Sequence, residues 1–343
     1  MTCCPISSKP RICTQSYNII DPLFSLYKNC RLCPRACGVD RLAGSAGYCG
    51  ESARLRLAFA GLHRGEEPPL SGKDGSGTIF VSGCNLGCVF CQNWQISTGG
   101  RAAKSTAAEA GSRLGRVVSA GEFTALCLEL QNRGAENINI VTGSHAVPAI
   151  ARCLTEAKAD GLRLPVLWNS SGYEKPETLE YLADSVDTWL PDLKTLDSGL
   201  SAQFFNAPDY PQAAVRAIVW MIQHRQHRPV TAALPGIIIR HLILPGRLES
   251  TRAVLRWFAE NAAGNALLSL MSQYTPISET GGPASGPGRF LNKREYETVL
   301  GWLGEYGIEN GFCQELLTGS DWLPDFNRPN PFSSDLSVAV WHF

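Results

Sequence analysis

Three cysteines in one short stretch of the chain have the spacing of iron–sulfur ligands. Cys84, Cys88 and Cys91 form a Cys-x3-Cys-x2-Cys pattern within residues 83–93, the cysteine loop. Three thiolates at these spacings can face one [4Fe–4S] cluster, whose four irons need four ligands. The loop supplies one ligand too few, so one iron stays open to another molecule, as in metal sites that bind substrate. The alternatives are a zinc site, which would want a fourth Cys or His nearby, and buried thiols without a metal.

A second group of cysteines precedes the cysteine loop. Its members, Cys30, Cys33, Cys37 and Cys49, are called the second cysteine set. Four thiolates can close either a zinc site or a [4Fe–4S] cluster. A metal would allow this part of the chain to fold without much core. We therefore expect a structural metal of either kind here, and an electron-relay cluster is the alternative.

Short β-rich runs alternate with amphipathic helical patterns along most of the chain. The strand candidates are Thr78–Ser82, Asn137–Val141, Pro165–Asn169, Thr188–Pro191, Gly236–Leu244 and Leu267–Ser272. The helix candidates are Gly121–Arg133, Val147–Asp160, Pro176–Ala183, Pro211–His224, Ser250–Asn261 and Lys293–Tyr306. This alternation predicts an α/β fold with a parallel sheet. Right-handed crossovers would curl the sheet toward a partial TIM-like barrel, although the spacing alone does not exclude a flat sheet.

The chain divides into three expected parts. Residues 1–72 form a cysteine-rich N-terminal segment that binds metal, residues 73–314 form the barrel, and residues 315–343 form an irregular, Pro- and aromatic-rich tail. Two glycine-rich stretches, Ser97–Ala120 and Glu279–Arg289, follow strands. Barrel enzymes place their active sites at the strand ends, so these stretches are either lids or surface insertions.

Polar residues stand at the ends of the predicted strands. They are Thr142, Ser144 and His145 after the second strand, Asn169 and Ser171 at the third, Asp192 and Lys194 after the fourth, Arg240 and His241 in the fifth, and Gln273 to Thr275 after the sixth. Such residues also cap helices or form surface ion pairs. Their recurrence at successive strand ends nevertheless favours a functional face. For His145 and His241, a substrate contact and a structural hydrogen bond are equally open.

Composition excludes several classes of protein. Lys plus Arg and Asp plus Glu both number 31, so the formal charge is zero. The clustered basic charge of a nucleic-acid-binding surface is therefore not expected. The N-terminus lacks the apolar core of a signal peptide, and no apolar run reaches the length that spans a membrane. We expect a soluble cytoplasmic protein, in which the 13 cysteines are metal ligands or buried thiols rather than disulfides. Burial is expected for Cys127, Cys153 and Cys313.

The cysteine loop, with Phe90 before its last cysteine, resembles that of the radical S-adenosylmethionine (radical SAM) superfamily. The runs Cys30-Arg-Leu-Cys33-Pro-Arg-Ala-Cys37, Asn169-Ser-Ser-Gly-Tyr173, Leu190-Pro-Asp-Leu-Lys194 and Arg240-His-Leu-Ile-Leu-Pro-Gly246 together resemble the PflX-type group of pyruvate-formate-lyase-activating-enzyme-like proteins. The resemblance implies a six-unit barrel and a [4Fe–4S] cluster whose open iron binds SAM. It also implies reductive cleavage of SAM to a 5′-deoxyadenosyl radical, which abstracts hydrogen from a substrate.

The resemblance further implies which residues contact SAM. Phe90 can offer an aromatic face to adenine. Asp192 and Lys194 resemble the Asp-x-Lys of glycyl-radical activating enzymes, where the lysine charge can reach the SAM carboxylate. The superfamily's Gly-Gly-Glu-type motif lacks its glutamate here, so Thr142 and Ser144 are the candidates for the SAM amine. The remaining candidate contacts are Asn169 and Ser171, which suit the ribose hydroxyls, and Arg240 and His241.

Partners are implied at the level of class. Reduction of the cluster requires an electron donor of the flavodoxin or ferredoxin type. The substrate is either a glycine of a glycyl-radical protein or a small molecule or peptide. A hypothesis of another class is a zinc-stabilised scaffold or binding module that has lost the radical chemistry. The intact Cys84, Cys88, Cys91 and Phe90 argue against that hypothesis.

Overall fold

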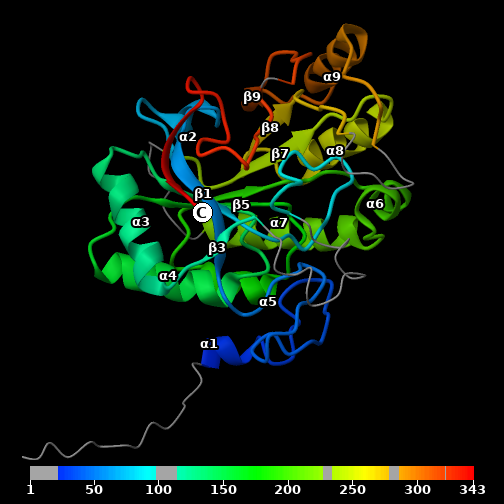
Figure 1. The fold of residues 1–343 in the computed structure, drawn as a ribbon. Helices are drawn as coiled ribbons and strands as arrows, with labels where there is room; N and C mark the ends of the chain where they lie inside the picture. Colours follow the sequence, from blue (N-terminus) through cyan, green and yellow to red (C-terminus); the bar gives the residue numbers. More distant parts are fainter. Residues whose placement is uncertain (1–21, 98–113, 227–233, 278–285, 321) are drawn as a thin grey trace, which may run out of the picture.

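The computed structural model describes residues 22–97, 114–226, 234–277, 286–320 and 322–343 (Figure 1). The two glycine-rich stretches predicted as lids or insertions fall largely outside these residues. Within them, no helix is both long and apolar enough to cross a membrane.

Parallel strands form the centre of the fold. The strands β2 (Ser76–Val81), β4 (Ile138–Val141), β5 (Val166–Ser170) and β6 (Thr188–Pro191) pair side by side in this order. A second parallel group contains β7 (Ile238–Leu242), β8 (Leu267–Met271) and β9 (Gly311–Cys313). Bridges between Trp189 and Ile237 and between Asp192 and Arg240 join β6 to β7. The predicted α/β fold with a partial barrel is therefore confirmed.

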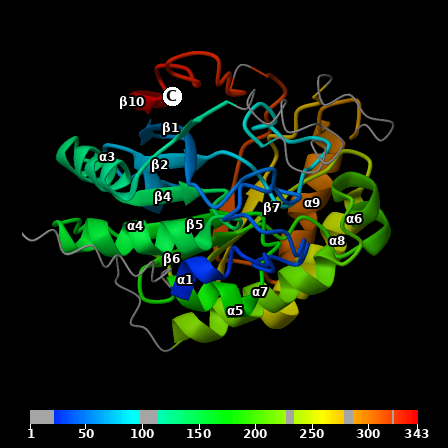
Figure 2. The ribbon, with the colours of Figure 1, turned by 60° about the horizontal axis from the view of Figure 1, so that its bottom comes forward.

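Helices cover the outside of the strands (Figures 1 and 2). They are α3 (Ala120–Asn132), α4 (Val147–Ala159), α5 (Pro176–Leu179) continued by a 3-10 turn (Glu180–Leu182), α6 (Ser198–Phe205), α7 (Tyr210–Gln226), α8 (Leu248–Asn261) and α9 (Lys293–Glu305). Both α3 and α9 begin with a capping box, in which the N-cap side chain and a glutamate three residues later bond each other's backbone. The six predicted helices are all present, and α6 is an additional one.

The sheet also contains antiparallel strands that the sequence pattern did not predict. The strand β1 (Arg56–His63) lies between β2 and β10 (Ser337–His342), and the short β3 (Arg116–Val117) also pairs with β1. The expectation of an irregular tail is therefore wrong over β10. A boundary between residues 72 and 73 would separate β1 from the sheet to which it belongs. β1 contains Ala58, Ala60 and Gly61, residue types that are depleted in strands, so its sequence gives only a weak strand signal.

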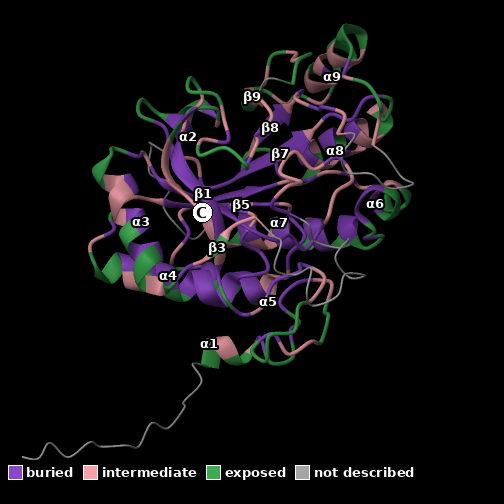
Figure 3. Cartoon of the chain, in the orientation of Figure 1, coloured by how far each residue is buried: buried purple, intermediate pink, exposed green. Residues whose placement is uncertain are grey.

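The N-terminal segment, residues 22–55, contains little regular structure beyond α1 (Pro22–Ser25). Its own apolar cluster is small and consists of Tyr27, Cys30, Leu32 and Ala53. Figure 3 shows largely buried strands in the barrel, whereas α1 and much of this segment are exposed or half-buried. The segment therefore depends on contacts with the barrel for its shape. The other short helix, α2 (Pro68–Ser71), lies between β1 and β2.

Three further cysteine predictions can be compared with the structure. Cys127 and Cys153 are buried in α3 and α4, as predicted. The prediction for Cys313 is wrong because this residue is exposed. It lies in β9, at the end of the second parallel group, where few neighbours cover it.

Candidate active site

The cysteine loop begins directly beyond the end of β2. The carboxyl ends of parallel strands meet at one edge of a barrel, where the connecting loops build active sites. Gly83 and Gly87 have φ angles of +84° and +73°, a left-handed conformation that favours glycine. A Cβ atom on Gly83 would lie 2.6 Å from Cγ of Glu51. The first turn of the loop therefore requires glycine for both its conformation and its packing.

The three thiols of the cysteine loop are close enough to influence one another electrostatically. Burial raises the pKa of Cys88, and the neighbouring Cys91 and Cys84 raise it further. Burial and Cys84 likewise raise the pKa of Cys91 to about 11. The backbone N–H of Leu86 lies 3.3 Å from the Cys84 sulfur, and the Ser97 hydroxyl lies 3.1 Å from the Cys91 sulfur. Hydrogen bonds of this kind stabilise thiolates that bind metal.

A buried ion pair lies beside these thiols. The Lys194 ammonium binds the Asp192 carboxylate just beyond the end of β6, and both side chains are more than four-fifths buried. Burial disfavours the charged lysine, but Asp192 and then Cys88 outweigh it, so the pKa of Lys194 is raised. In turn, Lys194 acts to lower the pKa of Cys88 against the effect of burial. A permanent positive charge therefore faces the cysteine loop, where the sequence predicted Lys194 to bind the SAM carboxylate.

Tyr210 of α7 connects the ends of two neighbouring strands, a role that sequence reasoning missed. Its hydroxyl accepts the Lys194 backbone N–H at 2.9 Å. The same hydroxyl lies 2.9 Å from the carbonyl oxygen of Ser171 and 3.0 Å from that of Asp192. Burial raises the pKa of Tyr210, so the phenol keeps its proton and can donate to these carbonyls. A tyrosine at the start of a helix carries no sequence signal of this role.

Phe90 is buried within an aromatic group. Its ring meets those of Phe204, Phe205 and Tyr274 edge-on, with centroids 5.7–5.9 Å apart. These contacts fix the cysteine loop against α6 and the segment after β8. The predicted contact between Phe90 and adenine stays a prediction.

The predicted residues at the ends of β4 and β5 lie in different surroundings. Thr142 has a φ of +65°, which is strained for a β-branched residue, and such strain gathers at functional sites. Asn169 and Ser171 are half-buried, and the Asn169 carbonyl accepts the Thr142 N–H at 2.9 Å. Ser144 instead donates to Oε1 of Glu174 at 2.8 Å. Ser170 and Trp168 also donate to this buried carboxylate, which the sequence analysis did not single out.

Arg240 and His241 are held by protein groups. The Arg240 guanidinium binds both Glu66 and Glu67, which precede α2. The His241 ring lies 2.7 Å from the Leu193 carbonyl oxygen and 3.0 Å from the Thr251 hydroxyl. Both ring nitrogens of His241 therefore have partners. This placement favours the structural alternative for His241, and it gives Arg240 a structural role whether or not it also contacts SAM.

The burial of His241 predicts a pH dependence of stability. Burial lowers its pKa from 6.5 to about 4, so between these values the unfolded chain binds the proton and the folded chain does not. Stability is therefore lost as the pH falls from 6.5 toward 4. Since one pKa unit corresponds to about 1.4 kcal/mol, this residue contributes up to about 3 kcal/mol.

Urea denaturation of the wild type and the His241→Asn protein across this pH range would measure the contribution. The asparagine amide can still donate to Leu193, and it does not titrate. The free energy of unfolding of the variant should fall less steeply with decreasing pH. Equal slopes would show that His241 is not the titrating group.

The N-terminal segment supports the cysteine loop directly. The Arg35 guanidinium donates to the carbonyl oxygens of Asn85 and Leu86, both at 3.0 Å. It also donates to the carbonyls of Phe205 and Asn206, at the end of α6. One side chain thus joins the cysteine loop to α6. The second cysteine set lies in this same segment, with Cys30, Cys33 and Cys49 buried and Cys37 exposed.

The donors around the cysteine loop fit an open [4Fe–4S] cluster. They comprise three thiols of one loop, backbone and hydroxyl hydrogen bonds to sulfur, and the Lys194 cation. Across the described ranges, no three Cys, His, Asp or Glu side chains meet closely enough to share one metal ion. A four-iron cluster binds each thiolate through a different iron, so its ligands stand further apart than those of a single ion.

The chain is similar to several known proteins. The uncharacterized protein MJ0674 of Methanocaldococcus jannaschii is 28% identical over 255 residues, which cover 74% of this chain and 68% of that protein. Methylornithine synthase (PylB) aligns with 76% of this chain and 74% of its own, with 14% identity and a TM-score of 0.45. A domain of pyruvate-formate lyase-activating enzyme from Bacteroides vulgatus ATCC 8482 aligns with 48% of this chain and 89% of its own, with 14% identity and a TM-score of 0.35.

SuiB of Streptococcus suis, in its structure bound to S-adenosylmethionine, aligns with 67% of this chain at 16% identity and a TM-score of 0.42. The alignment spans only 45% of the SuiB chain. The family model described as the Radical SAM superfamily matches residues 78–257, which is more than half of the present chain. The match includes the cysteine loop, Asp192 and Lys194. The chain therefore belongs to the radical SAM superfamily.

Proposed function

We propose that this protein cleaves SAM reductively and uses the resulting 5′-deoxyadenosyl radical to abstract hydrogen from a substrate. The observation that carries the proposal is the buried Lys194–Asp192 pair near the thiols of the cysteine loop. Membership of the superfamily implies a [4Fe–4S] cluster and SAM. The chain offers ligands for the first and a buried cation for the carboxylate of the second.

Each part of the site has a distinct role in this proposal. Cys84, Cys88 and Cys91 hold the cluster, which when bound supplies the electron that cleaves SAM. Lys194 attracts and orients the SAM carboxylate, and Asp192 keeps the lysine charged and in place. Tyr210 fixes the backbone that carries this pair. Thr142, Asn169 and Ser171 offer polar groups at the neighbouring strand ends.

The substrate and the electron donor are proposed by class. The resemblance to activating enzymes makes a glycine of a glycyl-radical protein the first substrate to test, and a small molecule or peptide is the alternative. One electron is consumed for each SAM cleaved, and a reduced flavodoxin or ferredoxin in the cytoplasm can supply it. The zinc-scaffold alternative gives no reason for the buried Lys194 to face the thiols.

Anaerobic SAM cleavage by the full-length protein tests the proposal. The protein, reconstituted with iron and sulfide and reduced with dithionite, should convert SAM to methionine and 5′-deoxyadenosine. Lys194→Met should raise the KM for SAM about 10- to 150-fold, since a hydrogen bond to a charged group contributes about 1.5–3 kcal/mol.

Lys158→Met is the control because Lys158, at the end of α4, donates to the backbone carbonyl oxygens of Asp184 and Ser185, away from the cysteine loop. Its KM for SAM should equal that of the wild type. Absence of 5′-deoxyadenosine from a fully loaded, reduced wild type, with each substrate class supplied, would contradict the proposed function.

A further inference from the structure

The second cysteine set surrounds a buried positive charge. Arg41 is only 2% exposed, and its guanidinium lies 3.7 Å from the Cys30 sulfur and stacks over the Tyr27 ring. Its other hydrogen bonds go to the carbonyl oxygens of Glu51, Ser52 and His145, at 2.6–3.0 Å. Within the described residues, Arg41 therefore has no carboxylate partner, although a buried charge ordinarily requires an opposite one.

The thiols of the set provide the missing negative charge once they are deprotonated. Cys30, Cys33 and Cys49 are buried. The Gly38 N–H donates to the Cys30 carbonyl oxygen at 2.9 Å and the Tyr48 N–H to the Cys37 sulfur at 3.3 Å, so the segments that carry Cys30, Cys37 and Cys49 lie side by side. Metal binding is what deprotonates such thiols at neutral pH. Four thiolates around a metal centre carry a net negative charge, which Arg41 would balance.

Hydrogen bonds to the sulfurs also suit a metal centre. The backbone N–H of Tyr48 donates to the Cys37 sulfur at 3.3 Å, and Arg41 donates to Cys30. A Cβ atom on Gly47 would lie 3.1 Å from the Cys37 sulfur, so glycine allows the backbone to approach it closely. In iron–sulfur proteins, donors of this kind adjust the reduction potential of the cluster.

The second cysteine set is connected to the cysteine loop through single residues. Arg35, which lies between Cys33 and Cys37 in the chain, donates to the carbonyl oxygen of Asn85 at 3.0 Å, and Asn85 follows Cys84. Tyr48 binds the Cys37 sulfur with its N–H, and its hydroxyl lies 3.3 Å from the Leu86 carbonyl oxygen. The Cys49 carbonyl oxygen would lie 3.0 Å from a Cβ on Gly83. A structural zinc ion would gain nothing from this proximity, whereas an electron carrier would.

We infer that Cys30, Cys33, Cys37 and Cys49 bind a second [4Fe–4S] cluster, fully ligated by protein, whose charge Arg41 balances. Because no iron is left open, this cluster would not bind SAM. It would accept one electron from the external donor and pass one electron to the cysteine-loop cluster for each SAM cleaved. The relay role rests on the proposed function, but the existence of the cluster does not.

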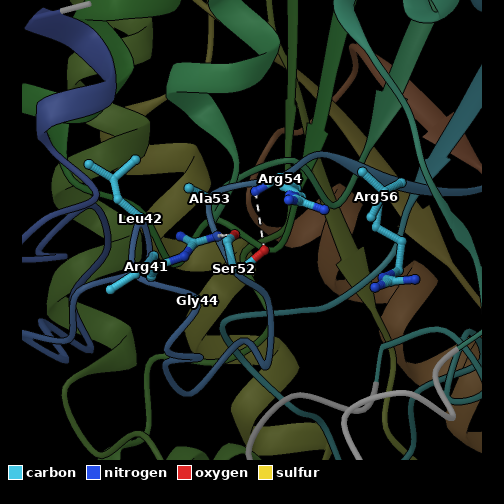
Figure 4. A pocket seen from close by; sticks show the side chains of 9 residues that line it. Arg41, Leu42, Gly44, Ser52, Ala53, Arg54 and Arg56 are labelled. Atoms are coloured by element: carbon cyan, nitrogen blue, oxygen red, sulfur yellow. Dashed lines mark hydrogen bonds between the residues drawn. The ribbon is translucent and has the colours of Figure 1, made fainter. Parts of the chain in front are cut away.

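The position of Arg41 gives this centre a route to the surface. Together with Ser52, Arg54 and Arg56, Arg41 lines a cavity of about 420 Å³ beside the N-terminal segment (Figure 4). Arg41 thus contacts both Cys30 and the cavity, whereas Tyr48 contacts both Cys37 and the cysteine loop. An electron relay requires contacts on both sides of this kind.

The deciding experiment removes the three thiols of the cysteine loop, so that only the second cysteine set can bind a cluster. The full-length Cys84→Ala/Cys88→Ala/Cys91→Ala protein, reconstituted anaerobically, should retain about four irons and four sulfides per chain, against about eight of each in the wild type. Its reduced form should give an electron paramagnetic resonance signal that SAM does not change. Cys127→Ala/Cys153→Ala, which removes two buried cysteines of α3 and α4, is the matched control and should load like the wild type.

Zinc instead of iron in the triple variant, or no bound iron and sulfide, would overturn the inference. If the triple variant does not fold, the electron paramagnetic resonance spectrum of the reduced wild type tests the inference instead. Two signals after reduction, of which SAM changes only one, would support the second cluster, and a single SAM-sensitive signal would refute it. These measurements do not depend on 5′-deoxyadenosine formation, so failure of the proposed function would be seen separately.

The relay role has its own test. Cys33→Ala/Cys49→Ala should lose a much larger share of 5′-deoxyadenosine formation with reduced flavodoxin than with dithionite, which can reduce the cysteine-loop cluster directly. The measured quantity is the ratio of the two rates in the variant, compared with the same ratio in the wild type. An unchanged ratio would refute the relay while leaving the iron content of the triple variant to decide the cluster.

Discussion

The Cys88→Ala protein is expected to lose all SAM cleavage. Cys88 lies between the other two thiols of the cysteine loop, and its pKa responds to both of them and to Lys194. Two remaining thiolates would leave two irons without protein ligands, so the cluster should not assemble at this loop. The measurement is 5′-deoxyadenosine release by the reconstituted, reduced protein, together with its iron and sulfide content.

Two variants make the Cys88 result specific. Cys127→Ala also removes a buried thiol, but in α3, and it should retain activity. Cys88→Ser keeps the size of the side chain and should be nearly as inactive as Cys88→Ala, because the missing feature is the thiolate. A Cys88→Ala protein that still cleaves SAM would show that this residue is not a cluster ligand.

The Arg240→Met protein is expected to be about 3–5 kcal/mol less stable than the wild type, the usual cost of removing one partner from a buried ion pair. Arg240 is 7% exposed and binds two carboxylates, which the variant would leave buried without a counter-charge. Burial acts to raise the pKa of Glu67, but Arg240 outweighs it and lowers the pKa. The free energy of unfolding from urea denaturation, followed by circular dichroism, is the measurement.

An exposed ion pair serves as the control, because it shows how much stability is lost when an ion pair is removed without leaving a buried charge. Arg252 binds Glu305 at 3.0 Å between α8 and α9, where both side chains are largely exposed. Arg252→Met should therefore change stability little. Replacing Glu66, Glu67 and Arg240 together by methionine should recover most of the loss, since buried ion groups can be exchanged for apolar ones. A small effect of Arg240→Met, accompanied by weaker SAM binding, would instead indicate direct contact with SAM.

Much of the barrel could be predicted because its signals are local. Each of the six predicted parallel strands contains a short β-rich run followed by polar or turn residues, and each main helix shows a periodic pattern of apolar positions. The strands β1, β9 and β10 could not be predicted in this way. β1 contains Ala and Gly, which are depleted in strands, and β9 has only three residues. The pairing of β10 with β1 joins residues more than 250 positions apart in the chain, such as His63 with Ser337.

The strand-end residues of the site show the same contrast between local sequence signals and contacts that depend on distant segments. Asp192 and Lys194 reach the cysteine loop as expected, since carboxyl ends of parallel strands share one edge. Arg240 is also on a barrel strand, but Glu67, 173 residues away, binds its guanidinium in the interior. His241, the next residue, is held by Leu193 and Thr251. No spacing rule distinguishes these outcomes.

The sequence alone was sufficient to identify the superfamily and the barrel, from three cysteines at cluster spacing in a loop and from the alternation of strand and helix patterns. It also located four further cysteines without indicating that they lie against that loop. The contacts of Arg35 and Tyr48 with the backbone carbonyls of Asn85 and Leu86, which bring the two groups of cysteines together, appear only in the folded molecule. The physical reason is that ligand spacing is local in the chain, whereas burial, charge pairing and the meeting of distant segments depend on how the whole chain packs.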